Sequence, residues 1–192
     1  MTDKTITIIG VGALGSHVAQ FLRNEGKLRV VDFDQVEAKN TLAQFHSKAS
    51  IRQRKATALS SMMNFLWGVK VDANTNKLVE NNAEQLIGTP SLVIDCLDNG
   101  AARRHVQRYT RQENLPCLHG ALAAGGAFGR VIWSENFAVD DEDAAGAPTC
   151  EDGGHLPFIV TVASLVAASA QHFLATGKKR GWTIAPTRIE MV

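Results

Sequence analysis

The sequence has few cysteines, and neither their number nor their spacing indicates disulfide bonds or a zinc site. Its 192 residues contain three, Cys96, Cys117 and Cys150. An odd and sparse set of this kind does not make a disulfide framework. No two of them lie at the C-x-x-C spacing of a structural zinc site. Because the first residues also lack the pattern of a secretory signal peptide, we expect a protein of the reducing cytoplasm and not a disulfide-rich or zinc-ribbon domain.

Strong charge of either sign is also missing, since 20 lysine and arginine residues face 19 aspartate and glutamate residues. The net charge of +1 favours neither nucleic acid nor an anionic membrane surface as a partner. One apolar run, residues 156–175, has the length of a membrane-spanning helix. Polar residues such as Ser164, Ser169 and Gln171 interrupt it, and Gly177 follows as a helix stop. We therefore expect a buried helix here and no membrane partner.

The order of apolar segments indicates a single α/β domain over residues 1–192. The length suits one domain with a full core, and we find no internal repeat or interdomain linker. Strand-like and helix-like segments alternate, which predicts a doubly wound, mostly parallel Rossmann-like sheet with helices on both faces and an antiparallel C-terminal edge. The expected strands are 5–9, 27–32, 69–71, 91–96, 116–119, 129–133 and 182–191, and the expected helices are 16–25, 51–67, 83–87, 100–112 and 156–175.

Three glycines, Gly10, Gly12 and Gly15, stand between the first expected strand and the first expected helix. In a G-x-G-x-x-G turn the first glycine permits the tight turn and the second lets the backbone approach a phosphate. The third lets the helix pack closely on the strand. N–H groups at the helix start then face the anion. This context predicts a nucleotide site, and the alternative is a glycine turn kept only for packing.

Asp32 ends the second expected strand, about 20 residues after the glycines. A carboxylate at this place accepts hydrogen bonds from the ribose hydroxyls of a bound nucleotide. That role suits a nicotinamide cofactor and ATP equally well. The glycines and Asp32 together therefore predict the kind of fold but leave the reaction open.

A further polar set points to adenylation rather than hydride transfer. An ATP triphosphate needs Mg²⁺ held by a carboxylate, together with cationic side chains on its phosphates and a path for the attacking carboxylate. Lys55 and Asp98, brought to the carboxyl edge of the sheet, would make such a magnesium–phosphate clamp. Taken singly, they are equally well explained as a solvated helix start and a helix N-cap. The whole set is Asp34, Asn40, Gln44, Lys55, Asp98, Asn99 and Arg103.

From Ile6 to Met191 the chain resembles the ThiF/MoeB-like, ubiquitin-activating family. The family pattern is a glycine loop, then D-x-D-x-V-x-x-x-N-x-x-R-Q, then a lysine that opens a helix, then D-N-x-x-x-R. The resemblance implies that Asp32 holds the ATP ribose, that Asn40 lines the phosphate region, and that Lys55 contacts the phosphates.

The same resemblance implies that Asp98 holds Mg²⁺ beside the α-phosphate, with Arg103 following it on the next helix. The implied activity is that of an ATP-dependent adenylyltransferase, a nucleotidyltransferase. It would activate the C-terminal carboxylate of a small ubiquitin-like or sulfur-carrier protein with a Gly-Gly tail. Relatives of this kind are commonly dimers, so the resemblance also implies a homodimer.

The sequence departs from the family pattern in three ways. The R-Q dipeptide is Ala43-Gln44, so a phosphate-neutralising arginine is absent, and Arg52 or Arg54 would have to replace it. The two zinc-binding C-x-x-C pairs of many relatives are absent, as is the arginine-bearing extension before the first strand of MoeB-like relatives. The first and third departures favour a second hypothesis, a non-catalytic subunit of this fold. A third, a nicotinamide-dependent oxidoreductase, would use only the glycine loop and Asp32.

Each of two further residues, Cys150 and His119, is explained either by a functional role or by an ordinary structural one. Cys150 lies in an acidic loop where family members often have a cysteine that receives the activated carboxyl group. Glu151 and Asp152 beside it would raise the pKa of a nucleophilic thiol, so it is also explained as an ordinary loop cysteine. His119 is expected at a strand end near the crevice, where a histidine with satisfied hydrogen bonds is the simpler interpretation.

Overall fold

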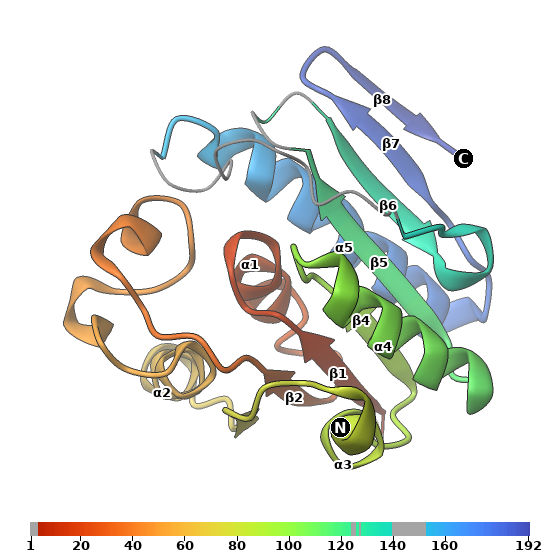
Figure 1. The fold of residues 1–192 in the computed structure, drawn as a ribbon. Helices are drawn as coiled ribbons and strands as arrows, with labels where there is room; N and C mark the ends of the chain where they lie inside the picture. The colour runs from red at the N-terminus through yellow and green to blue at the C-terminus, as the bar shows by residue number, and fades with distance from the viewer. Residues whose placement is uncertain (1–3, 124–125, 127, 140–152) are drawn as a thin grey trace.

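One mixed sheet organises the computed structural model of this chain, which describes residues 4–123, 126, 128–139 and 153–192. The strand order is β3-β2-β1-β4-β5-β6-β7-β8 (Figure 1). The strands are β1 Thr5–Ile9, β2 Lys27–Val31, β3 Val71–Asn74, β4 Leu92–Asp95, β5 Cys117–Leu122, β6 Gly129–Trp133, β7 Trp182–Ala185 and β8 Arg188–Met191.

The first five strands are parallel, and β6, β7 and β8 continue the sheet as antiparallel strands. After β1 the chain moves outward through β2 and β3, and then returns to the other side of β1 with β4. The strand order therefore reverses between β1 and β4, which is where open α/β sheets bind ligands. The predicted doubly wound class and its antiparallel C-terminal edge are confirmed.

Helices cover both faces of the sheet. Figure 1 shows α5 on one face of the sheet and α4 on the other. Residues from α1, α2 and α5 share one core cluster with Ile6, Ile8 and Leu28, whereas residues from α3 and α4 share a second with Ile9 and Val93. This division follows from the alternation of side chains along a strand. The helices are α1 Ala13–Phe21, α2 Lys55–Trp67, α3 Ala83–Ile87, α4 Gly100–Gln112 and α5 Leu156–Thr176.

The apolar helix α5 packs along β5 and β6 and beside α1. Among the described helices it alone has the length and hydropathy of a membrane span, and 39% of its most apolar window is buried inside the protein. Its buried apolar side chains are Ile159, Val162, Ala163, Val166, Ala167 and Ala170. The predicted helix is therefore present, and one side of it belongs to the core.

Two strand glycines set how closely α5 approaches the sheet. A Cβ atom added at Gly120 would lie 3.0 Å from a methyl group of Val166, and one added at Gly129 would lie 2.6 Å from a methyl group of Val162. Real Cβ atoms do not approach other atoms to 2.6 Å, so the helix lies where only glycine fits beneath it. Close packing of this kind leaves no room for an added methyl group.

Several element bounds differ from those predicted. The first helix begins at Ala13, inside the glycine motif, and ends at Phe21. The expected helix start at Ile51 was wrong, because Arg52 takes a left-handed backbone with φ of 74° and its N–H donates to the Val36 carbonyl. Strand β3 lies at 71–74 and not at 69–71, and the expected last strand is a hairpin, β7 and β8.

We expect Gly129→Ala to lower the free energy of unfolding by about 1–3 kcal/mol, the usual cost of overpacking. The new methyl group would overlap Val162, so Val162→Ala in the same chain should recover part of the loss. Urea denaturation of both single variants and the double variant measures this. Strictly additive costs, within about 0.5 kcal/mol, would show that the two positions do not share the space.

Candidate functional site at the carboxyl edge of the sheet

The turn from β1 into α1 is made by glycines with different tasks. Gly10 has φ of +82°, a left-handed conformation that glycine adopts without strain, and its N–H donates to the Val31 carbonyl. A Cβ atom at Gly15 would lie 1.8 Å from the Gly10 carbonyl oxygen, so α1 approaches the turn more closely than any side chain allows. At Gly12, by contrast, the nearest atom is Nε2 of Gln44 at 4.0 Å, which leaves this position open.

Asp32 directly follows β2 and lies against this turn. Its Oδ2 accepts a hydrogen bond from the Val11 N–H at 2.8 Å, and its Oδ1 accepts one from the Asp34 N–H at 2.8 Å. Burial raises the pKa of Asp32, while the hydrogen bond from Val11 and the charge of Lys55 oppose that rise. Each carboxylate oxygen has a second lone pair, so the group remains able to accept bonds from a ribose.

Lys55 is the first residue of α2, as the family pattern implied and in contrast to the helix start expected at Ile51, and it joins the same cluster. Its N–H donates to the Asp34 carbonyl at 2.8 Å, and its Nζ lies 3.4 Å from Oδ2 of Asp34. The Lys55 side chain is 10% exposed, whereas that of Asp34 is 51% exposed. An ammonium group is therefore fixed near Asp32, with the carboxylate of Asp34 on its solvent side.

The segment between Asp34 and α2 supplies Asn40 and Gln44. Asn40 is buried in a short 3-10 helix, Ala38–Leu42, where its Oδ1 accepts a hydrogen bond from the Glu37 N–H. Gln44 is buried beside Gly12. Ala43, which stands where the resembled pattern has arginine, is 1% exposed and packs in the core shared by α1 and β1. Position 43 thus presents no charge at this edge of the sheet.

The two residues named as replacements for that arginine are exposed. Arg54 donates to the Phe33 carbonyl, which fixes its guanidinium beside the chain that follows β2. Arg52 lies in the left-handed turn before α2. Lys55 is therefore the basic residue that the structure places next to Asp32.

Asp98 lies in the turn between β4 and α4 and is exposed. Because Ile9 and Asp95 are paired at the ends of the parallel strands β1 and β4, this turn opens at the same edge of the sheet as the glycine turn. Asn99 is the N-cap of α4, with its Oδ1 accepting from the Ala102 N–H at 3.0 Å. The N-cap reading proposed for Asp98 therefore belongs to Asn99, and the carboxylate of Asp98 has no capping task.

Arg103 does not face this edge but points into the protein. Its guanidinium lies 3.2 Å from Oδ2 of Asp95, and it also donates to the carbonyls of Leu97 and Gly120. His119 Nδ1 lies 2.7 Å from the same Asp95 oxygen, so one carboxylate joins β4, β5 and α4. Arg103 was predicted to contact the nucleotide, but its guanidinium donates hydrogen bonds inside the protein instead. His119 is fully buried with its hydrogen bond made, as the simpler interpretation expected, but it lies within β5 and not at the expected strand end.

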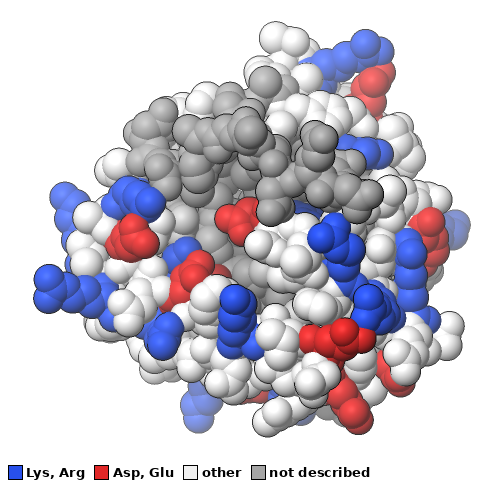
Figure 2. Space-filling model, viewed as in Figure 1, with Lys and Arg blue, Asp and Glu red and all other residues white. Residues whose placement is uncertain are grey.

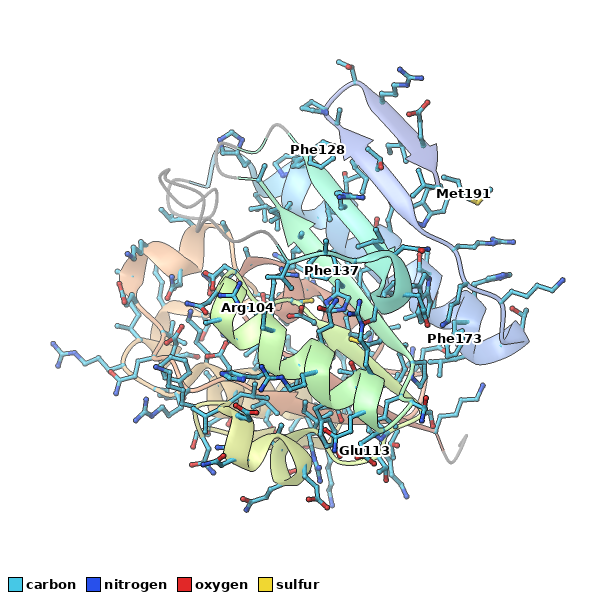
Figure 3. All side chains as sticks on the ribbon, turned by 45° about the vertical axis from the view of Figure 1, so that its right-hand side comes forward. Arg104, Glu113, Phe128, Phe137, Phe173 and Met191 are labelled. Carbon is cyan, nitrogen blue, oxygen red and sulfur yellow. The ribbon has the colours of Figure 1, made fainter. Side chains whose placement is uncertain are left out.

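Phe137, which follows β6, covers this buried group. Its ring stacks on His119 with 4.2 Å between centroids, and the Arg103 guanidinium lies 5.5 Å from the ring. Gln107 and Arg111 on α4 both donate to the Phe137 carbonyl. Figure 3 shows Phe137 above α4 and beside β5. The chain that leaves β6 is therefore fastened to α4 at this residue.

Asp95 owes its ionised state to these neighbours. Burial disfavours its charge, but the Arg103 guanidinium and the hydrogen bonds from His119 and the Leu97 N–H outweigh burial and lower the pKa of Asp95. Asp95, Phe137 and His46, whose Nε2 lies 2.9 Å from the Val11 carbonyl oxygen in the glycine turn, were not among the predicted site residues. Only Asp95 gave a signal in the sequence, as a charged residue at the end of an apolar strand.

The cysteines divide into two groups. Cys96, just after β4, is partly buried and Cys117 in β5 is buried; burial raises the pKa of both thiols, which disfavours the reactive thiolate form. Cys150, the predicted nucleophile, lies outside the described residues.

Figure 2 shows basic side chains gathered over α4 with acidic ones among them, in agreement with the small net charge.

Known proteins match this chain along most of its length. The sequence profile of the ThiF family matches residues 1–187. A molybdopterin-synthase adenylyltransferase of Salmonella typhimurium is 27% identical over 185 residues, covering 91% of this chain and 74% of the relative. The adenylyltransferase and sulfurtransferase MOCS3 of Drosophila ananassae is 34% identical over 131 residues, covering 66% of this chain and 28% of the relative.

Solved structures share the fold at lower identity. E. coli MccB with MccA-N7isoASN superposes with a TM-score of 0.82 at 15% identity, over 99% of this chain and 64% of MccB. E. coli MccB with ATP gives a TM-score of 0.81 at 14% identity, over 99% of this chain and 62% of MccB. The chain thus spans less than two thirds of the MOCS3 and MccB chains.

Removing the charge of Asp95 should be costly, because Arg103 would remain buried without its counter-ion. We expect Asp95→Asn to lower the free energy of unfolding by about 3–5 kcal/mol in urea denaturation at neutral pH. The control is Asp72→Asn, which breaks the surface ion pair with Arg29 and should cost less than about 1 kcal/mol. Equal costs at the two positions would refute the buried-charge account.

The same carboxylate predicts a dependence on pH. Since the pKa of Asp95 is lower in the folded than in the unfolded chain, its contribution is complete above the unfolded value of about 3.9. It is lost as the pH falls through the lower folded value. The stability difference between wild type and Asp95→Asn should therefore shrink on acidification, and a difference that grows at low pH would contradict the assignment.

Proposed function

The chain belongs to the ThiF family, and from that premise we propose that it is an ATP-dependent adenylyltransferase. Its substrate is the C-terminal carboxylate of a small ubiquitin-like or sulfur-carrier protein with a Gly-Gly tail. The observation that carries the proposal is the meeting of the glycine turn, Asp32 and Lys55 at the point where the strand order reverses. Relatives named as a molybdopterin-synthase adenylyltransferase and a SAMP-activating enzyme E1 support the reaction class.

The reaction joins the substrate carboxylate to AMP. One carboxylate oxygen attacks the α-phosphorus of ATP, the bond from that phosphorus to the bridging oxygen breaks, and pyrophosphate leaves with its electron pair. The products are an acyl-adenylate and pyrophosphate. No general base is required, because a C-terminal carboxyl group is already ionised at neutral pH. Catalysis then consists of positioning and charge neutralisation.

The chain's own residues divide these tasks. The N–H groups at the start of α1 face the phosphates over the open Gly12 position. Asp32 holds the ribose, and the ammonium group of Lys55 neutralises phosphate charge at a position set by Asp34. When ATP binds, the ammonium group of Lys55 leaves the carboxylate of Asp34 and pairs with a phosphate instead.

The exposed carboxylate of Asp98 suits Mg²⁺, which keeps several waters and takes one or two carboxylates together with substrate phosphates. The described residues contain no group of three or more histidine, cysteine or acidic side chains that would hold a metal ion by themselves. A site completed by phosphate oxygens fits that donor set. Bound there, Mg²⁺ would withdraw charge from the phosphate oxygens.

A specific observation favours a second candidate, a nucleotide-binding subunit without catalysis. Ala43 is buried in the core, so the position that the family pattern gives to arginine supplies no cation. Loss of one such contact is worth several kcal/mol of transition-state stabilisation. The nicotinamide-dependent alternative rests on the glycine turn and Asp32 alone and leaves Lys55 without a task.

The proposal also includes the oligomeric state of the protein and a role for Cys150. A homodimer is expected from the family resemblance, and a catalytic arginine would then be supplied by a partner protein. Cys150, in the segment between Phe137 and α5, would receive the activated carboxyl group as a thioester with release of AMP. Mass spectrometry of the intact chain after turnover would detect that adduct.

ATP–pyrophosphate exchange with Mg²⁺ tests the proposed reaction. We expect exchange that depends on a small carrier protein with a free Gly-Gly tail and that Asp98→Ala abolishes. The control is Glu84→Ala on α3, which removes one exposed acidic charge away from this edge and should leave exchange unchanged.

The outcomes separate the candidates. Exchange that survives Asp98→Ala would remove Asp98 from the site. A wild-type chain that shows no exchange while ATP raises its melting temperature would establish the binding subunit instead. A rise in melting temperature with NAD and none with ATP would favour the oxidoreductase.

A further inference from the structure

The peptide groups of Val11, between Gly10 and Gly12, are held from two sides. Its N–H donates to Oδ2 of Asp32 at 2.8 Å, and its carbonyl lies 2.9 Å from Nε2 of His46. The Val11 side chain is fully buried. Neither polar group of Val11 is therefore free to turn toward a ligand, which leaves that task to the N–H groups that follow at Gly12 and the start of α1.

The ring of His46 acts as a donor here, since a carbonyl oxygen only accepts. Nε2 therefore carries a hydrogen, and the buried Nδ1 has no hydrogen-bond partner among the described residues. Burial lowers the pKa of His46 to about 4; the hydrogen bond to Val11 opposes this shift, and the nearby charge of Lys55 adds a smaller lowering. The imidazole is thus neutral at physiological pH and holds the turn without repelling Lys55.

The chain around His46 is fastened to α1 by two more contacts. The Phe45 N–H donates to the Ser16 hydroxyl at 2.9 Å, and that hydroxyl donates to the Gly12 carbonyl at 2.6 Å. Nε2 of His17 lies 3.0 Å from the Ala43 carbonyl. Residues 43–46 and the glycine turn therefore form one hydrogen-bonded unit, which also brings Gln44 beside Gly12.

We infer that His46 is a positioning residue of the nucleotide site, because its Nε2–H fixes the Val11 peptide and with it the direction of the N–H groups that follow. The ligand named in this inference rests on the proposed function. The conformation of the free turn does not, so the two are tested separately.

Three substitutions distinguish the donor from the ring. The amide nitrogen of glutamine reaches the place of Nε2, that of asparagine reaches only the place of Nδ1, and leucine fills the space without a donor. We expect His46→Gln to keep the affinity for Mg-ATP within about threefold of wild type. His46→Asn and His46→Leu should each weaken it about tenfold or more, the effect of one lost hydrogen bond.

Affinity is measured by isothermal titration calorimetry on protein that circular dichroism shows to be folded, so that lost stability is not counted as lost binding. His172→Leu, at a partly exposed position near the C-terminal end of α5, is the control and should bind as wild type does. Wild-type affinity in His46→Leu, or equal losses in the glutamine and asparagine variants, would overturn the inference.

Amide hydrogen exchange of the Val11 N–H in the ATP-free protein provides the independent readout, because its hydrogen bond to Asp32 protects it while the turn is held in place. Exchange should be faster in His46→Asn and His46→Leu than in His46→Gln and wild type. Equal rates in all four proteins would overturn the role of His46 whether or not ATP binds. A wild-type chain that binds no ATP would overturn the proposed function, while the exchange rates would still decide the role of His46.

Discussion

The carboxyl edge of the sheet, where we propose that a nucleotide binds, depends on how closely α1 approaches the end of β1. A side chain at Gly15 would occupy the place of the Gly10 carbonyl oxygen, and Gly10 itself has a left-handed backbone. This close approach brings the start of α1 directly over the carboxyl edge of the sheet, where its unpaired N–H groups are concentrated. Asp32 and Lys55 lie around that turn because β2 and the chain after it pass alongside β1.

A second constraint lies on the β4 side of the strand reversal. There the buried carboxylate of Asp95, and not apolar packing alone, holds the elements together. Asp95 collects Arg103 and His119, and Phe137 lies over both. Breaking such a group costs more than forming it gains, so it specifies one relative placement of β4, β5 and α4. The turn that carries Asp98 begins at this group, since Arg103 also holds the Leu97 carbonyl.

Local sequence patterns were sufficient to predict most of the fold and the position of the candidate site. The glycine spacing, the apolar strands and the start of α2 at Lys55 predicted the sheet and the edge that bears the site. What they could not predict were contacts between distant segments. Arg103 matches a motif position, yet only the fold shows that Asp95 and Gly120 engage it internally. His46 has no local signal, because its partner Val11 is brought near by the path of the chain.

The central place of β1 has a consequence for how the chain is made. Ile6 pairs with Leu28 on one side and with Leu92 on the other. During synthesis the first partner emerges soon after β1, but the second follows much later. Until β4 leaves the ribosome, an apolar strand has one unsatisfied edge, and parallel pairing over such a separation is slow. The strand that leads into the glycine turn therefore keeps an unpaired edge, a risk for aggregation, until β4 has been synthesised.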